Sequence, residues 1–468
     1  MPSRLMGETP MLRKLRVEMT HLLIDIGYLL LLIVASPLWL YRMIRHGRYR
    51  RNLAQRLGAA PVRYGLQPTI WAVGVSVGEI KAAQMLVREL HSQLPDYRVV
   101  ISSWTDAGLD EARRLYEPDH LVFARPLDFS LAVGRALDRI RPSLVVFVEG
   151  DIWPNFLGAC NKRGIPVAVI NGRMSPKKGY PRYRMLGPLA PRLLFNRLSA
   201  IGVQDETYAD CYRKLGTHAD KVHVTGMIKF DRGVSDRVDG QDELAAAMGI
   251  SSGDQLIVAG GTGDGEEAMV LEAFKQVRAK HPRAKLAIIP RKPERFDEVA
   301  RQIAASRFEV VRRTQRTTAG DSVDPQAVLL GDTMGELRKY YPLASAVFVG
   351  RSLVPMGGSD MIEPAALGAA TCFGPHTYNF PQAAELVKHG CVRVNDVASL
   401  AATLDGWLSD AASATAAGKS AQQFVAAQQG ATRRNVEMLC GLLGRVPAVA
   451  EGGIATDEIH STPASTGG

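Results

Sequence analysis

The feature that most constrains the fold of this chain is a regular alternation of strand-like and helix-like segments. Short apolar runs alternate with amphipathic stretches, first from Thr69 (TIWAVGV, then EIKAAQMLVRELHSQL) and again from Gln255 (QLIVAGG, then EEAMVLEAFKQVRAK). Runs rich in β-branched residues, separated by helical patterns, are typical of βαβ units and a parallel sheet. At 468 residues the chain is long enough for two or three domains. We therefore predict an α/β protein with two Rossmann-like, doubly wound domains.

The domain boundaries follow from where this alternation stops. Residues 230–245 are polar and lack a strand pattern, which predicts a hinge, and helical spacing over 421–443 suggests a segment that crosses back to the first domain. Two doubly wound domains are expected to face a binding cleft at the carboxyl ends of their strands. We predict a basic N-terminal segment at 1–60, Rossmann-like domains at 61–235 and 236–445, and a disordered tail at 446–468.

The N-terminal segment combines positive charge with a hydrophobic stretch. Residues 1–60 hold ten Lys and Arg against three acidic residues, so seven of the net +10 charges lie there. Between the basic clusters, Ile26–Tyr41 has no charged residue, and extending the run back past Asp25 to Leu22 gives a length close to that of a membrane span. We expect a membrane anchor at about 22–41, with interfacial aromatic residues and a cytoplasmic basic flank.

Several alternatives bear on this segment. It could span the bilayer, or lie in one leaflet with a kink at Pro37, or be a buried core helix of a soluble protein. Binding to nucleic acid is disfavoured, because the charge lies beside a hydrophobic anchor and no platform of aromatic and basic residues is visible. The five cysteines are far apart and form no CxxC pair, which indicates reduced, structural cysteines and catalytic domains on the cytoplasmic side of the membrane.

Two candidate sites follow apolar strands of the first domain. Ser76, Gly78 and Glu79 open a helix, where backbone N–H groups can hold an anion and a carboxylate can act as a general base, although a glutamate there is commonly only a helix cap. Glu149 and Asp151 end the strand SLVVFV and could bind hydroxyl groups or a cation, although Asp151 could equally cap the helix that begins near Pro154. No histidine or further acid lies at ligand spacing, so we expect no metal.

Candidate phosphate-binding residues lie in the second domain. Arg291, with Lys292 and Arg295, follows the strand LAII and suits phosphate recognition, or forms a solvated basic turn. Gly-containing turns also follow successive apolar runs near 331–337, 350–363 and 373–375. We expect their backbone amides to hold a diphosphate-like or phosphodiester group, and Glu363 to accept a hydrogen bond from a ribose.

These motifs, in this order, resemble the 3-deoxy-D-manno-octulosonic acid (Kdo) transferases of lipopolysaccharide synthesis. The resemblance runs from about residue 20 to 440. It is carried by a Trp-containing strand leading into SVGE at 71–79, ExxxWPN at 149–155, TGxxKFD at 225–231, PRxPERF at 290–296, GDTMGEL at 331–337, SLVPxGG…EPAALG at 352–368 and FGPHTxNF at 373–380.

The resemblance implies a GT-B fold and transfer of Kdo from CMP-Kdo to a lipid A precursor at the inner membrane, with inversion and without a metal or other cofactor. Glu79 would be the general base. The donor nucleotide would be bound by Arg291, Met334, Gly335, Glu336, Gly358, Ser359, Asp360 and Glu363. The acceptor side of the cleft would include Ser76, Gly78, Glu149, Asp151 and Arg173. The partners implied are the lipid A precursor, the CMP-sugar and membrane lipids, and no nucleic acid.

The chain departs from the family pattern at several polar positions. Ser359 and Asp360 replace the usual His-Asn, so Asp360 would bring negative charge close to an anionic donor, and Lys292 replaces a usual His. Two alternatives therefore remain open: a GT-B transferase with a different UDP- or CMP-linked donor or a different acceptor, and a catalytically silent membrane-bound paralogue.

Overall fold

The computed structural model describes residues 10–46, 51–176, 179–231, 233–316 and 323–446. The chain divides into two compact units. Unit 1 comprises the chain up to Val224 together with the segment from Arg433, and unit 2 comprises Thr225–Thr432. The tail from 446, which we expect to be disordered, lies outside the described residues from 447 onward.

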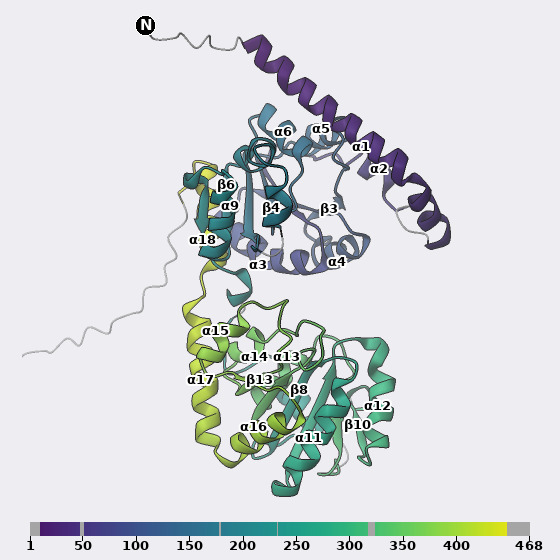
Figure 1. Ribbon diagram of the computed structural model, residues 1–468, viewed down its shortest axis with the longest axis vertical. Helices are drawn as coiled ribbons and strands as arrows, with labels where there is room; N and C mark the ends of the chain where they lie inside the picture. The colour runs from purple at the N-terminus through teal and green to yellow at the C-terminus, as the bar shows by residue number, and fades with distance from the viewer. Residues whose placement is uncertain (1–9, 47–50, 177–178, 232, 317–322, 447–468) are drawn as a thin grey trace, which may run out of the picture. The chain divides into compact units, whose positions relative to one another are not determined.

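Unit 1 is a parallel seven-stranded sheet covered by helices (Figure 1). Its strand order is β3-β2-β1-β4-β5-β6-β7, and every pairing between its described strands is parallel. The strands are β1 (Thr69–Gly74), β2 (Arg98–Ser103), β3 (Leu121–Ala124), β4 (Leu144–Val148), β5 (Val167–Gly172), β6 (Ala200–Val203) and β7 (Val222–Val224). The helices are α1 (Pro10–His46), α2 (Leu53–Arg56), α3 (Val77–Gln93), α4 (Asp106–Tyr116), α5 (Ser130–Ile140), α6 (Pro154–Lys162), α7 (Tyr180–Arg184), α8 (Leu189–Leu193) and α9 (Glu206–Lys214).

Unit 2 repeats this architecture with the strand order β10-β11-β9-β8-β12-β13-β14. Its strands are β8 (Gln255–Thr262), β9 (Ala284–Pro290), β10 (Val310–Arg312), β11 (Val328–Leu330), β12 (Ala346–Val349), β13 (Thr371–Phe373) and β14 (Val392–Arg393). Its helices are α10 (Gln241–Met248), α11 (Glu266–Lys280), α12 (Phe296–Ala305), α13 (Leu337–Tyr340), α14 (Ile362–Ala366), α15 (Ala383–Lys388), α16 (Val397–Ser409) and α17 (Ala411–Ala427). Helix α18 (Ala431–Leu442) begins in unit 2 and belongs to unit 1 from Arg433 onward.

The strand order places a topological switch point in each unit. In unit 1 the first strand β1 lies beside β4, and the connections leave these two strands in opposite directions along the sheet. In unit 2 the corresponding neighbours are β8 and β12. Loops that leave two such strands diverge and form a crevice at their carboxyl ends, where doubly wound folds bind ligands. The loops after β1, β4, β8 and β12 are therefore expected to bind ligands.

Helix α1 lies against unit 1, where it contacts α5 and α6 (Figure 1). By length and composition its segment Met19–Pro37, with a mean hydropathy of 1.9, could cross a membrane. The large apolar side chains of this segment are mostly exposed, which differs from the alternative of a buried core helix. The exposed ones are Met19, Leu22, Leu23, Ile26, Leu29, Leu30, Leu31, Ile33 and Val34.

Polar side chains on the opposite face of α1 join the helix to unit 1. Asp25 Oδ1 accepts hydrogen bonds from the backbone N–H of Ser130 (3.0 Å) and from Asn155 Nδ2 (2.7 Å), and the Ser130 hydroxyl donates to Asp25 Oδ2. His21 Nδ1 is 2.7 Å from Asn155 Oδ1. Because His21, Asp25 and Tyr28 are spaced four and three residues apart, they lie along one face of the helix. Asp25, which interrupts the apolar run in the sequence, therefore accepts hydrogen bonds from Ser130 and Asn155.

Candidate functional site

The loop after β1 holds Glu79 in a reciprocal arrangement with Ser76, the residue that precedes helix α3. Ser76 is the N-cap of α3, and its Oγ lies 3.4 Å from the Glu79 backbone N–H that donates to it. The Ser76 hydroxyl also donates to Glu79 Oε1 (3.1 Å), and the Val75 backbone N–H donates to Glu79 Oε2 (2.7 Å). The backbone N–H groups of Val75 and Glu79 thus both have acceptors, and the Glu79 carboxylate is fixed in place.

Burial raises the pKa of Glu79 to about 7, and the neighbouring charges of Glu149 and Asp151 add to the rise. The hydrogen bonds from Val75 and Ser76 act in the opposite direction, because they favour the charged form. A carboxylate with a pKa near neutrality can accept a proton at physiological pH, and it binds that proton more strongly than an ordinary glutamate does. This geometry and this pKa suit the predicted role of a general base.

The loop after β4 carries the other two acidic residues. Glu149 has a φ of 65° and Gly150 a φ of 107°, so the chain turns sharply at the strand end. A left-handed conformation at a non-glycine residue costs on the order of 1–3 kcal/mol and is often found at functional sites. The Glu149 carboxylate lies 3.4 Å from Asn171 Nδ2, and Asn171 also has a positive φ of 51°. Because β1 and β4 are neighbours, the loops that carry Glu79, Glu149 and Asp151 adjoin at the switch point, and the charges of Glu149 and Asp151 act on Glu79.

Arg125 completes this site, and the sequence reasoning missed it. Its side chain is 2% exposed, and its Nη1 donates to Asp151 Oδ2 (3.0 Å) and to the Asp151 carbonyl oxygen (3.1 Å). Its guanidinium carbon lies 5.3 Å from the ring centre of Phe147 and 5.9 Å from that of Trp153. Arg125 follows β3 directly, so the rule that picked out the residues after β1 and β4 could also have found it.

Helix α6 is capped by a residue from another segment. Asp151 does not cap it, which corrects one of the two interpretations of that residue; its Oδ2 instead accepts from Arg125 and from Trp153 Nε1 (3.0 Å). Asp128 is the capping carboxylate, accepting from the backbone N–H groups of Asn155 (3.0 Å) and Phe156 (2.8 Å). Burial raises the pKa of Asp128 to about 6, although both of these hydrogen bonds lower it.

The remaining residues predicted for unit 1 lie nearer the surface. Gly78 is exposed in the first turn of α3, and a Cβ there would lie 3.7 Å from Ser76 Oγ, so the backbone does not require glycine. Arg173 is also exposed, and its backbone N–H donates to the Glu149 carbonyl oxygen (3.3 Å). Among the described residues no group of three or more His, Cys, Asp or Glu side chains could hold a metal ion.

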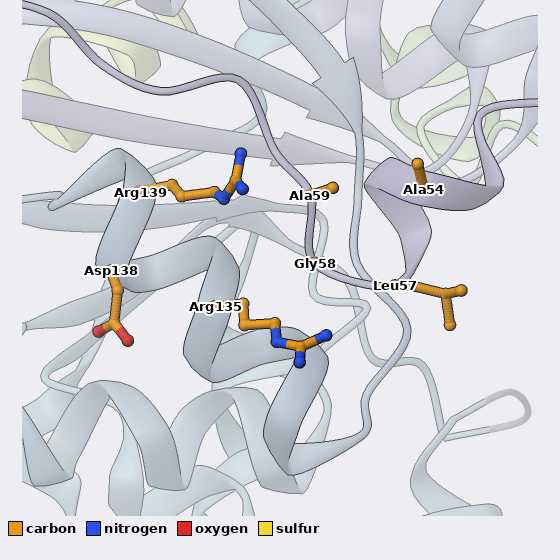
Figure 2. A pocket seen from close by; sticks show the side chains of 7 residues that line it. All are labelled: Ala54, Leu57, Gly58, Ala59, Arg135, Asp138 and Arg139. Atoms are coloured by element: carbon orange, nitrogen blue, oxygen red, sulfur yellow. The ribbon is translucent and has the colours of Figure 1, made fainter.

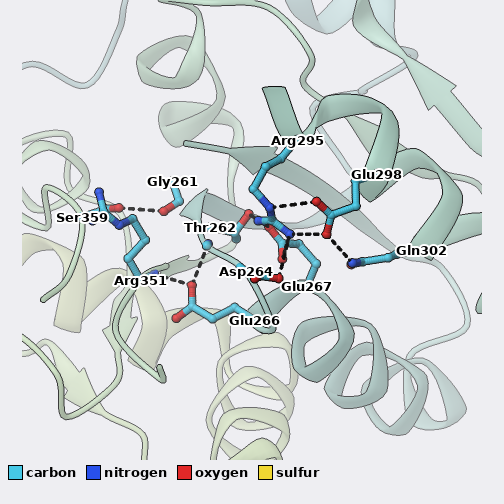
Figure 3. A network of polar contacts seen from close by, with 11 residues as sticks. Gly261, Thr262, Asp264, Glu266, Glu267, Arg295, Glu298, Gln302, Arg351 and Ser359 are labelled. Atoms are coloured by element: carbon cyan, nitrogen blue, oxygen red, sulfur yellow. Dashed lines mark hydrogen bonds and ion pairs between the residues drawn. The ribbon is translucent and has the colours of Figure 1, made fainter. Parts of the chain in front are cut away.

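In unit 2 the loop after β12 meets a buried glutamate at the start of α11, the helix that follows β8 (Figure 3). Glu266 is fully buried, and its carboxylate accepts hydrogen bonds from the backbone N–H groups of Gly263 (2.9 Å), Arg351, Ser352 (2.7 Å) and Leu353 (2.9 Å). We predicted that amides of this glycine-containing turn hold a phosphate group. That prediction is wrong for residues 351–353, because a carboxylate of the chain itself already occupies them.

The basic motif after β9 divides into two parts. Arg295 forms ion pairs with Glu267 (2.6 Å) and Glu298 (2.9 Å), and Glu267 also accepts from the Thr262 hydroxyl (2.8 Å; Figure 3). Arg295 is therefore a structural residue rather than a phosphate ligand. Arg291 and Lys292 are exposed at the end of β9, where the Arg291 backbone N–H donates to the carbonyl oxygen of Thr262, the last residue of β8. Of the two arginines in this motif, Arg291 is the one placed to meet a ligand.

The Met334–Glu336 turn is held by ion pairs. Glu336 pairs with Arg313 (3.0 Å) and Lys339 (3.2 Å), and the Thr333 hydroxyl donates to its Oε2 (2.6 Å). Burial opposes ionisation, but these hydrogen bonds outweigh it and lower the pKa of Glu336. Gly335 has a φ of 91°, and the Met334 side chain is 62% exposed. The glutamate therefore shapes the turn, and Met334 and Gly335 are its accessible residues.

The Gly358–Glu363 segment lies in the connection after β12 and contacts the end of β8. Gly358 has a φ of 87°, and the buried Ser359 donates its hydroxyl to the Gly261 carbonyl oxygen (2.7 Å; Figure 3). Asp360 Oδ1 accepts from the Ile362 backbone N–H (3.2 Å) at the start of α14. Glu363 lies in the first turn of α14, where its Oε1 is 3.9 Å from Arg338 Nη1. The predicted nucleotide residues thus gather on adjoining loops of unit 2.

A hollow of about 460 Å³ elsewhere in unit 1 is lined by Arg135, Asp138 and Arg139 of α5 and by residues 54 and 57–59 (Figure 2). Arg139 donates to the Ala60 carbonyl oxygen (3.0 Å), and Asp138 pairs with Arg163 (2.8 Å). Two of its three charged side chains are therefore already engaged in structural contacts. None of the predicted site residues lines this hollow, so we do not assign the chemistry to it.

Comparison with known proteins gives consistent matches. Residues 51–232 match a family described as 3-deoxy-D-manno-octulosonic-acid transferase (kdotransferase). The 3-deoxy-D-manno-octulosonic acid transferase of Bordetella pertussis is 33% identical over 87% of this chain and 96% of its own length. That of Haemophilus influenzae is 28% identical over 89% of this chain and 98% of its own length.

Among solved structures, a glycosyltransferase from Rickettsia africae matches with a TM-score of 0.56 and 14% identity, over 81% of this chain and 99% of that one. At this level of identity the likeness concerns the fold alone. It confirms the predicted class, GT-B with two α/β units.

Proposed function

The chain belongs to the 3-deoxy-D-manno-octulosonic acid transferase family, and we propose that it moves Kdo from CMP-Kdo to a hydroxyl group of a lipid A precursor, with inversion. It is a glycosyltransferase, as the names of its relatives indicate. The observation that carries the proposal is Glu79, a half-buried carboxylate with a pKa raised to about 7, fixed by Val75 and Ser76 at the switch point of unit 1.

In the proposed reaction Glu79 takes the proton of the acceptor hydroxyl while that oxygen attacks the anomeric carbon of Kdo. The bond from the anomeric carbon to the phosphate oxygen breaks, and CMP leaves with the electron pair. A single displacement inverts the configuration at that carbon. Glu149 and Asp151 favour proton uptake because their negative charges raise the pKa of Glu79.

The donor would be bound by unit 2. Arg291 would meet the phosphate, the turn at Met334 and Gly335 would contact the nucleotide, and Glu363 would accept from the ribose. Glu336 would act indirectly, since Arg313, Lys339 and Thr333 already bind its carboxylate. Fixed donors that stabilise the departing phosphate supply electrostatic catalysis. No metal takes part in this scheme.

We further propose that the protein acts at the inner membrane, with both units on the cytoplasmic side. The support is the apolar segment Met19–Pro37 together with its exposed apolar side chains. An acceptor whose acyl chains stay in the bilayer needs an enzyme that is held at the surface of that bilayer.

The test is a transfer assay with membrane-extracted protein, CMP-Kdo generated in place and a tetra-acylated lipid A precursor, read by the mass of the lipid product. We expect a gain of one or more Kdo units, lost in Glu79→Ala and Glu79→Gln. Glu206→Ala is the matched control, because Glu206 is also in the first turn of a helix but is exposed and pairs with Arg213 on the same helix.

Other outcomes identify the alternatives. Thermal stabilisation by CMP without product would indicate a different sugar or acceptor, and stabilisation by UDP would indicate a UDP-sugar enzyme. Nucleotide binding without turnover of any donor would indicate a silent paralogue.

A further inference from the structure

Unit 1 contains a cavity of about 190 Å³ between helix α1 and the body of the domain. Leu31 and Leu32 of α1 line one side, and Trp104, Pro126, Phe129 and Trp153 line the other. The cavity lies apart from the hollow near Arg135, and no prediction from the sequence anticipated it.

Tyr28, Asp128 and Arg125 border the cavity and bind other groups through their polar atoms, although the buried Arg125 Nε has no hydrogen-bond partner among the described residues. The Tyr28 hydroxyl donates to Asp128 Oδ2 (3.0 Å), and Asp128 also accepts from the N-terminus of α6. Arg125 directs its Nη1 to Asp151. What remains facing the cavity is aliphatic and aromatic surface, which suits a hydrocarbon and offers little to a sugar or a phosphate.

One side of the cavity is continuous with the exposed apolar face of α1. Leu31 lines the cavity and is also 65% exposed. It neighbours Leu30 and Val34, which are 58% and 79% exposed. An exposed apolar face of this extent marks contact with a membrane or a partner, and here it lies on a segment apolar enough to enter a bilayer. Leu31 therefore joins the exposed apolar face of α1 to the apolar lining of the cavity.

On the other side of the cavity, lining side chains form hydrogen bonds to Asp151, a neighbour of the proposed base Glu79. Trp153 and Arg125, which both border the cavity, each donate to Asp151 Oδ2 at 3.0 Å. Asp151 in turn is one of the charges that act on Glu79. The cavity lining is thus connected to the proposed general base through Asp151, which Arg125 and Trp153 contact and whose charge acts on Glu79.

We propose that this cavity binds one acyl chain of the lipid acceptor and so places the acceptor hydroxyl near Glu79. The inference rests on the proposed function, because it assigns the cavity to that reaction's acceptor. The polar contacts of His21, Asp25 and Tyr28 fix α1 against the domain, so the cavity keeps its shape when it is empty. Binding then costs less ordering than it would in a site formed on contact.

A binding measurement tests the cavity without any turnover. The protein, with Trp39→Phe to remove the tryptophan of the anchor, is placed in lipid nanodiscs and mixed with lipid A precursor carrying a brominated acyl chain. Bromine quenches tryptophan fluorescence at contact distance, so Trp104 and Trp153 should be quenched, and the quenching should be lost in the variant that also carries Trp104→Phe and Trp153→Phe. No quenching would overturn the proposal. Equal quenching by a brominated phospholipid would assign the cavity to a bystander lipid and overturn it as well.

A kinetic measurement tests whether the cavity contributes to sugar transfer. Leu32→Trp fills the cavity, whereas Leu30→Trp places the same side chain on the exposed face of the same helix. For the tetra-acylated acceptor we expect Leu32→Trp to raise KM at least fivefold, with no change in Leu30→Trp and none in either variant for a deacylated acceptor. Equal KM values in the two variants would refute the acyl-chain site while transfer itself persists. Absence of transfer by the unmodified protein would instead refute the proposed function. The quenching experiment would still test whether the cavity binds an acyl chain.

Discussion

Ser76 and Glu79 hold each other through two hydrogen bonds, one from the Ser76 hydroxyl to the Glu79 carboxylate (3.1 Å) and one from the Glu79 backbone N–H to the Ser76 oxygen (3.4 Å). The same pair starts helix α3 and fixes the proposed base. The stability of the helix N-terminus and the protonation of the catalytic carboxylate are therefore linked.

The first prediction concerns the pH dependence of transfer. Because Glu79 must be deprotonated to act as a base, kcat/KM should rise with pH through an apparent pKa of about 7. Ser76→Ala removes a hydrogen bond that favours the charged form, so the acidic limb should move to higher pH. Ser76→Thr keeps the hydroxyl and should restore the profile. An unchanged limb in Ser76→Ala would show that another group controls it.

The second prediction concerns stability. The pKa of Glu79 is about 7 in the folded protein and near 4.5 in the unfolded chain, so the folded state binds more protons between these values. Stability contributed by this group is present below pH 4.5 and is lost as pH rises through 7. Glu79→Gln should therefore be more stable than the unmodified protein at pH 8, by about 1 kcal/mol after solvent screening. Urea unfolding at pH 8 and pH 5 measures the difference, which should shrink at the lower pH.

The third prediction separates the two arginines of the basic motif. Arg291→Ala should weaken CMP binding at least tenfold and leave the melting temperature unchanged, because the side chain is exposed. Arg295→Ala should lower the stability by about 2 kcal/mol, because it leaves the buried Glu267 without its ion-pair partner. Calorimetric titration and thermal melting measure the two effects. Equal loss of stability in both variants would contradict this division.

The fourth prediction concerns Glu266. In Glu266→Gln the negative charge is lost, and the amide NH₂ meets backbone N–H groups that need an acceptor. We expect a loss of about 2–3 kcal/mol in urea unfolding. Glu272→Gln, an exposed change on the same helix, should cost less than about 0.5 kcal/mol. Similar values for the two variants would mean that the buried contacts contribute little.

The fifth prediction concerns how α1 meets the membrane. Asp25 and Tyr28, inside the apolar segment, are hydrogen-bonded to Ser130, Asn155 and Asp128 of the domain, so a spanning helix would draw these polar groups into hydrocarbon. We expect α1 to lie along one leaflet, with both ends of the chain on the same side. Cysteines introduced at Ser3 and Ser465 should react with an impermeant maleimide from the cytoplasmic side only. The described native cysteines are buried and should not interfere.

One result of the maleimide labelling would contradict the prediction that α1 lies along one leaflet. Labelling of the Ser3 position from the periplasmic side and of the Ser465 position from the cytoplasmic side would establish a spanning helix. Asp25→Leu lengthens the apolar run and removes the contacts to Ser130 and Asn155, so it provides the variant in which spanning becomes more favourable.

The sequence predicted the sheets well because their signal is local. Buried strands of β-branched residues can be predicted from the local sequence, and the ends of those strands marked Glu79, Glu149 and Asp151 as candidates, whereas only the strand order shows that their loops adjoin. Arg125 lies at an equivalent strand end, but an isolated arginine after a strand carries no local signal that it is buried.

Contacts between distant segments could not be predicted in the same way. Asp128 caps a helix that begins 26 residues later, and Glu266 binds amides more than 80 residues away. Neither pairing leaves a periodic pattern in the sequence, because each depends on how the loops fold back. Asp25 is a similar case, since alone it reads as a defect in an apolar helix and only the structure supplies its partners.

The carboxylate of Glu266 has a consequence for inhibitor design. A phosphate mimic aimed at the amides of residues 351–353 would compete with an anion tethered to the same fold, and a tethered group acts at a very high effective concentration. Such compounds should fail at this loop however well their geometry matches it. Compounds aimed at Arg291 instead meet a side chain that is exposed to solvent.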